Sequence, residues 1–151
     1  MISRLNLGNF IKLAPATIAG LKAVAEGVKQ GSIPSELAEL INLRVSQING
    51  CGFCLQMHLK EAAKLGMDES LLLLLPVWRE TAVFNDREKA ALALAEAITG
   101  ISQSPVSDQV FLDAQRHFDD TELAHLVSAA VAINGFNRIA LTYLFSIPTN
   151  A

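Results

Sequence analysis

From Pro34 to Gly66 the chain reads PSELAELINLRVSQINGCGFCLQMHLKEAAKLG, and this stretch predicts two helices joined by a short turn. Pro34 can open the first helix, which ends at Asn49-Gly50. The second begins near Cys51 and ends at residue 65, with Gly66 in the position after a helix end that glycine favours. The apolar residues recur at helical spacing and do not alternate, so neither segment is expected to form a strand.

Helices are also expected on both sides of this pair. Before it, Pro15 opens a helix that runs to about Lys29. After it, the signals predict a short leucine-rich turn between Asp68 and Pro76, a helix from Asn85 to Thr99, one opening at Ser104-Pro105 and a long one from Asp119. Asn85 with Glu88, and Asp119 with Glu122, have the spacing of capping boxes. The sequence therefore predicts an all-α fold, a single-domain helical bundle over residues 1–151.

A weak internal repeat relates two parts of the chain. Residues 36–40 read ELAEL and residues 122–126 read ELAHL, while ING at 48–50 recurs at 133–135. The helices that precede the two copies share the pattern A-x-A-E. A duplicated helix pair would produce these matches, and so would chance similarity between helices rich in Ala, Leu and Glu.

Charge and hydropathy limit the classes of partner. The chain has 12 Lys and Arg against 15 Asp and Glu, a net charge of −3, and no cluster of basic residues. A nucleic-acid-binding protein would normally carry a basic face, so this class is not expected. The mean hydropathy of +0.34 is high for a monomer and indicates a homo-oligomer that buries apolar surface between subunits.

The most apolar stretch, residues 123–147, is long enough to span a bilayer. It carries His125, Asn134, Asn137 and Arg138, which would be strongly unfavourable inside a membrane. We therefore interpret it as a buried helix. The N-terminal residues lack the apolar segment and cleavage site of a secretory signal, so a cytoplasmic protein without membrane contact is expected.

Both cysteines lie in the motif Cys51-Gly52-Phe53-Cys54. A structural zinc site needs four ligands, and only His58 and a carboxylate could complete this one. A structural disulfide would close a very small loop in a reducing compartment, where such bonds are rare. The motif therefore favours a redox-active dithiol, with no metal, flavin or haem cofactor.

Helix geometry places His58 beside this pair. At 100° per residue, Cys51, Cys54 and His58 fall within about 60° of one another around the helix axis. Cys54 and His58 are four residues apart, a spacing at which their side chains can meet. The helix start also favours the thiolate form of cysteine, which is the reactive nucleophile.

With Glu39 on the preceding helix, these residues resemble the AhpD-like alkylhydroperoxidases of the carboxymuconolactone decarboxylase superfamily. That family carries a glutamate, a CxxC motif about a dozen residues later, and a histidine four residues after the second cysteine, as Glu39, Cys51, Cys54 and His58 do here. Phe53 stands where some members have another histidine, which removes a second imidazole from the mechanism. Phe53 could form an apolar wall for the substrate, or serve as a core or interface aromatic.

The resemblance implies a thiol-dependent peroxidase that reduces organic hydroperoxides and assembles as a trimer or hexamer. Cys54 is expected to be the attacking thiolate, His58 its base oriented by Glu39, and Cys51 the cysteine that closes the disulfide. The reductant is expected to be a dithiol protein of the dihydrolipoyl type that attacks the more exposed sulfur, taken to be that of Cys51.

Three other functions remain open: a general thiol–disulfide oxidoreductase, a decarboxylase or ring-lactone enzyme like others in the superfamily, and a non-catalytic oligomeric subunit. The remaining polar residues of note are expected to be structural. His125 occupies the repeat position of Glu39, His117 has no cysteine near it, and Asn137-Arg138 could anchor a subunit contact or a neighbouring helix end.

Overall fold

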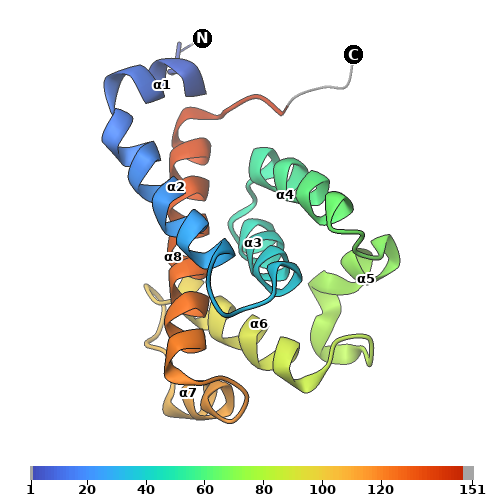
Figure 1. Cartoon of the computed structure of the whole chain (residues 1–151). Coiled ribbons are helices and arrows are strands. Elements are labelled where there is room, and N and C mark those ends of the chain that lie inside the picture. The colour runs from blue at the N-terminus through green and yellow to red at the C-terminus, as the bar shows by residue number, and fades with distance from the viewer. Residues whose placement is uncertain (1, 148–151) are drawn as a thin grey trace.

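Helix α3 (Ser35–Asn49) lies at the centre of the computed structural model, which describes residues 2–147 (Figure 1). Eight of its residues are buried, because other helices surround it. The remaining elements are α1 (Leu7–Leu13), α2 (Pro15–Lys29), α4 (Gly52–Lys64), α5 (Glu69–Leu74), the 3₁₀ helix η1 (Leu75–Glu80), α6 (Asp86–Thr99), α7 (Asp108–Gln115) and α8 (Asp120–Tyr143). Every regular element in the described range is helical, which confirms the all-α prediction.

The two copies of the sequence repeat lie on α3 and α8, and these helices pack against each other. Helix α2 packs along α8, as Figure 1 shows, and α6 packs on α3 in the corresponding way. Where the helices meet, Asn49 Nδ2 donates to Asn134 Oδ1 at 3.0 Å, and these asparagines hold equivalent positions in the repeat. The two copies of the repeat thus lie in direct contact, as a duplicated helix pair would allow.

A buried polar cluster continues from this contact. Asn49 Nδ2 also donates to Asn137 Oδ1 at 2.9 Å, and Asn137 Nδ2 donates to Ser46 Oγ at 3.1 Å. Asn137 has no exposed surface, and all its polar contacts hold the end of α3. Asn137 was predicted to anchor either a subunit contact or a neighbouring helix end, and the second of these roles is confirmed.

Most helix ends lie where local chemistry predicts them. Both capping boxes form: Asn85 and Glu88 exchange hydrogen bonds, and so do Asp119 and Glu122. Gly50 ends α3 with a φ of 70°, a left-handed conformation that residues with a Cβ rarely adopt.

The structure differs from the predictions at four places: one short helix was missed, and three helix boundaries differ. Helix α1, capped by the Asn6 side chain, was missed because it is short and buries no residue. Helix α7 begins after Ser107, whose hydroxyl caps it, and not at Ser104-Pro105. The leucine-rich segment continues through Pro76 into η1, since proline fits the first turn of a helix. Helix α8 ends at Tyr143, because Leu144 turns left-handed with a φ of 53°.

None of the helices within residues 2–147 combines the length and hydropathy that a bilayer-spanning segment needs.

Candidate active site

The turn between α3 and α4 places the two cysteines. After the reversal at Gly50, the Cys51 N–H donates to the Ser46 carbonyl at 3.0 Å. Cys51 is the N-cap of α4, and its sulfur accepts from the Cys54 backbone N–H at 3.3 Å. A disulfide joins the two residues, whose Cα atoms lie 5.4 Å apart. The pair therefore stands at a helix N-terminus, where negative charge on sulfur is stabilised.

His58 lies one turn further along α4 and contacts Glu39. Its Nδ1 lies 2.7 Å from Glu39 Oε2, which confirms the predicted hydrogen bond. Glu39 is only 4% exposed, and a buried carboxylate needs hydrogen-bond partners to offset the loss of contact with water. Its second oxygen accepts from Asn42 Nδ2 at 3.3 Å. Asn42 was not predicted as a site residue from the sequence. The signal that could have identified it is its position one helical turn after Glu39.

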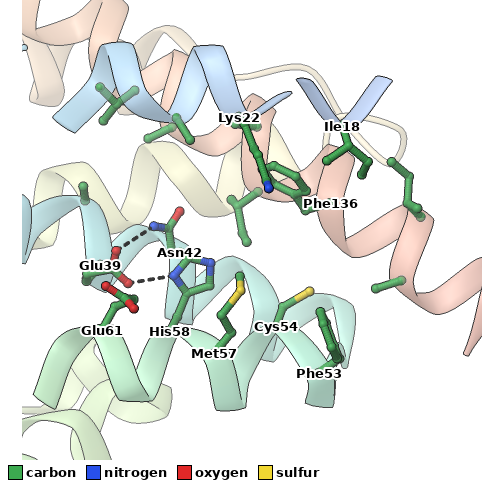
Figure 2. A pocket seen from close by; sticks show the side chains of 18 of the residues that line it. Ile18, Lys22, Glu39, Asn42, Phe53, Cys54, Met57, His58, Glu61 and Phe136 are labelled. Carbon is green, nitrogen blue, oxygen red and sulfur yellow. Dashed lines mark hydrogen bonds and ion pairs between the residues drawn. The ribbon is translucent and has the colours of Figure 1, made fainter. Parts of the chain in front are cut away.

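The other ring nitrogen of His58 has an unusual environment. Nε2 is buried and has no hydrogen-bond partner among the described residues. Glu39 accepts a hydrogen bond from Nδ1, so in the neutral ring it is Nε2 that carries the lone pair. Leaving such a group unpaired costs about 1–3 kcal/mol, which a ligand or reacting proton can recover. Figure 2 shows the ring beside Glu39, with the Met57 side chain between it and Cys54 in this view.

These groups line a cavity of about 410 Å³ between α2, α3, α4 and α8. Cys54, His58 and Glu39 contribute to its wall, and most of the remaining lining is aliphatic or aromatic. Phe53 is part of the lining, as one of its two predicted roles requires, and it also packs edge-on against Phe145 at 5.7 Å between ring centroids. The site is thus suited to an apolar molecule that reaches a sulfur and an imidazole.

The predicted exposure of Cys51 is wrong. Cys51 and Cys54 are each only 1% exposed, and Cys54 is the one that lines the cavity. The chain after α8 crosses the start of α4, so a Cβ on Gly52 would lie 2.7 Å from Ile147. This cover comes from residues more than ninety positions along the chain, which the local motif could not reveal.

The other histidine of interest is held outside the cavity. His125 Nδ1 lies 3.1 Å from Ser32 Oγ, so it supports the connection between α2 and α3 as a structural residue. The His117 carbonyl accepts a hydrogen bond from Arg87. Within residues 2–147, no group of three or more His, Cys, Asp or Glu side chains is placed to hold a metal ion.

The four site residues fall inside a match to a known family model. Residues 15–97 match the model of the carboxymuconolactone decarboxylase family. The chain belongs to this family. An uncharacterized protein of Bacillus subtilis, YdfG, is 36% identical over 133 residues, which span 88% of this chain and 90% of that protein.

Solved structures place this family member among AhpD-like folds. A protein of unknown function from Agrobacterium tumefaciens, assigned to the antioxidant defence protein AhpD, is 34% identical with a TM-score of 0.90. That match covers 99% of this chain and 100% of the other. The debrominase Bmp8 is 18% identical with a TM-score of 0.81, covering 92% of this chain and 75% of its own, and shares the fold.

Proposed function

We propose that this protein is a thiol-dependent peroxidase that reduces organic hydroperoxides through a cycle of the Cys51–Cys54 pair. The observation that carries the proposal is the apolar cavity whose wall contains both Cys54 and His58, the latter with a buried and unpaired nitrogen, Nε2. A cysteine nucleophile needs a base for its proton, and the base needs a second group to hold its orientation. The 2.7 Å contact between His58 and Glu39 supports the orienting role, and the position of His58 in the same cavity wall as Cys54 supports the role of base.

Oxidation begins from the reduced dithiol. His58 Nε2 takes the proton of Cys54, and the thiolate attacks the terminal oxygen of the hydroperoxide. The O–O bond breaks, Cys54 becomes a sulfenic acid, and the departing alkoxide takes the proton back from His58 to leave as an alcohol. The Cys51 thiol then attacks the Cys54 sulfur, which forms the disulfide and releases water.

Reduction requires access to a sulfur, and the cavity gives access to Cys54. A thiolate of the dithiol reductant attacks the Cys54 sulfur, and Cys51 leaves as a thiolate. The Cys54 N–H, which already contacts the Cys51 sulfur at 3.3 Å, stabilises that leaving group. The second thiol of the reductant then closes its own disulfide and frees Cys54. A dihydrolipoyl group on a partner protein in a reducing compartment such as the cytoplasm would serve.

The test is hydroperoxide consumption with a dihydrolipoyl dithiol as reductant, in wild type, Cys54→Ser and Cys51→Ser. Cys54→Ser should abolish turnover. Cys51→Ser should still consume one equivalent of hydroperoxide per subunit and accumulate sulfenic acid, read by mass spectrometry after trapping with dimedone. Retained first oxidation in Cys54→Ser and its loss in Cys51→Ser would reverse the two roles.

The same assay separates the other candidate functions. A general thiol–disulfide oxidoreductase would exchange disulfides without saturable hydroperoxide turnover. A decarboxylase or lactone enzyme would keep its activity when both cysteines are replaced by serine. Either result would exclude the peroxidase as the main activity.

A further inference from the structure

Two lysines of α2, Lys22 and Lys29, line the cavity, and both are exposed. Ile18, Lys22, Ala25 and Val28 follow one another at helical spacing and all line the cavity. Apart from Lys22, these four residues are apolar, as expected for the inner face of an amphipathic helix. Figure 2 shows the Lys22 side chain directed from α2 towards Phe136 on α8. A charged residue that departs from the local pattern at such a position suggests a functional reason.

The acidic side chains that line the cavity have partners, and Lys29 lies close enough to Glu61 to influence its pKa. Glu39 contacts His58 and Asn42. Glu61 contacts Lys64 at 2.6 Å, and this hydrogen bond, together with the nearby charge of Lys29, lowers the pKa of Glu61. For Lys22, the described residues supply neither a hydrogen bond nor an ion pair. Because Lys22 is exposed, its ammonium lies in contact with solvent at the edge of a largely apolar wall and is free to bind an anion.

We propose that Lys22 binds the carboxylate of an amphiphilic substrate whose alkyl chain fills the cavity and whose hydroperoxide reaches Cys54. The inference rests on the proposed peroxidase function and specifies its substrate class as hydroperoxides of monocarboxylic acids. The cavity volume of 410 Å³ lies within the range of about 300–1,000 Å³ typical of small-molecule sites. An apolar wall with a few placed polar groups is the usual design of such a site, the polar groups fixing the ligand's orientation.

The first experiment compares the terminal hydroperoxide of decanoic acid with that of its methyl ester, below the concentration at which either aggregates. Wild type should favour the acid in kcat/KM, and Lys22→Gln should reduce this preference by about three- to tenfold, mainly through KM. The matched control is Lys60→Gln, which removes the same charge from an exposed position of α4 outside the cavity. Equal loss in both variants would overturn a specific role for Lys22.

The second experiment needs no turnover, so it remains informative if the peroxidase proposal fails. Binding of unreactive decanoate and of methyl decanoate to the oxidised protein is measured by calorimetry in wild type, Lys22→Gln and Lys60→Gln. The affinity for decanoate should fall about three- to tenfold in Lys22→Gln but not in Lys60→Gln, while the affinity for methyl decanoate should be unchanged in both variants. Unchanged decanoate affinity would overturn the inference. A fall in subunit number for Lys22→Gln in light scattering would overturn it too, because the residue would then serve a contact between subunits.

Discussion

At the scale of single residues, Glu39 illustrates how far local spacing reaches. Its distance from the CxxC motif led to the expectation that it orients His58, and the contact between the two forms at 2.7 Å. The pattern did not predict Asn42, which accompanies Glu39, or Lys22, which faces the cavity from a helix outside the motif. Such neighbours depend on how helices pack, and local spacing carries little information on that.

Glu39 and His58 are expected to act as one unit in oxidising Cys54. His58→Ala should slow peroxide-driven disulfide formation by ~10²–10⁴-fold, because it removes the base. Glu39→Gln keeps the size of the side chain but removes the charge that orients and strengthens this base, so the rate should fall less. The double variant should be little slower than His58→Ala, because both residues serve one proton path. The check is rapid-quench thiol counting across pH, and additive losses would show that the residues act separately.

Glu96 is a second partly buried carboxylate, with a structural role. It accepts from Arg44 Nε at 2.7 Å, Trp78 Nε1 at 2.8 Å and Arg79 Nη2 at 2.6 Å, which ties α3, η1 and α6 together. Burial raises the pKa of Glu96, but these three donors together outweigh it and hold the pKa below its usual range. Because none of these contacts is local, none of them could be predicted from the sequence.

This lowered pKa predicts how stability depends on pH. Because the folded pKa lies below the unfolded one, Glu96 stabilises the fold above the unfolded value of about 4.3, and this contribution is lost as pH falls through the folded pKa. Glu96→Gln should therefore lower the melting temperature at pH 7. At acidic pH, the melting temperatures of the variant and of wild type should lie closer together. Glu80→Gln, at an exposed position of η1, is the control. A difference that stays constant with pH would contradict the prediction.

At the scale of elements, the close approach of α8 restricts which residue can stand in the link between α2 and α3. Gly31 follows α2, and a Cβ there would lie 2.6 Å from His125 Cε1. The ring is held by Ser32 and by its own position on α8, so it cannot move freely. The sequence predicts the end of this helix near Lys29, just before Gly31, but the reason for glycine at this site is the close approach of α8.

Gly31→Ala should therefore destabilise the fold by about 1–3 kcal/mol, the usual cost of forcing extra volume into a packed site. Gly27→Ala is the matched control, because a Cβ at Gly27 meets nothing within 4 Å inside α2. That control should raise stability by about 0.5–1 kcal/mol, since alanine is the better helix former. Both are measured by urea unfolding with an unchanged slope. Equal effects from the two substitutions would show that the His125 contact does not limit this position.

At the scale of the whole molecule, features set by local signals could be predicted from the sequence, and features set by long-range packing could not. Helix starts and ends were largely predictable because caps such as Asn85–Glu88 and left-handed glycines such as Gly50 act within a few residues. The repeat also indicated which helices correspond, and the Asn49–Asn134 contact joins the two copies. The burial of Cys51 was not predictable, since the segment after α8 reaches the neighbouring Gly52 from more than ninety residues along the chain.

The last prediction concerns assembly. Apolar side chains that would normally be buried stand exposed on α5 and η1, with Leu73 at 73% and Val77 at 49%. Neighbouring exposed apolar residues favour association, so we expect light scattering to give a mass that is a multiple of 16.2 kDa, as for a trimer or hexamer. The Leu73→Asp/Val77→Asp variant should reduce this mass, because each carboxylate would have to be desolvated in the contact. Leu13→Asp, at an equally exposed leucine of α1, is the control and should not change it. A wild-type mass of 16.2 kDa would refute assembly, and an unchanged mass in the double variant would place the contact on another face.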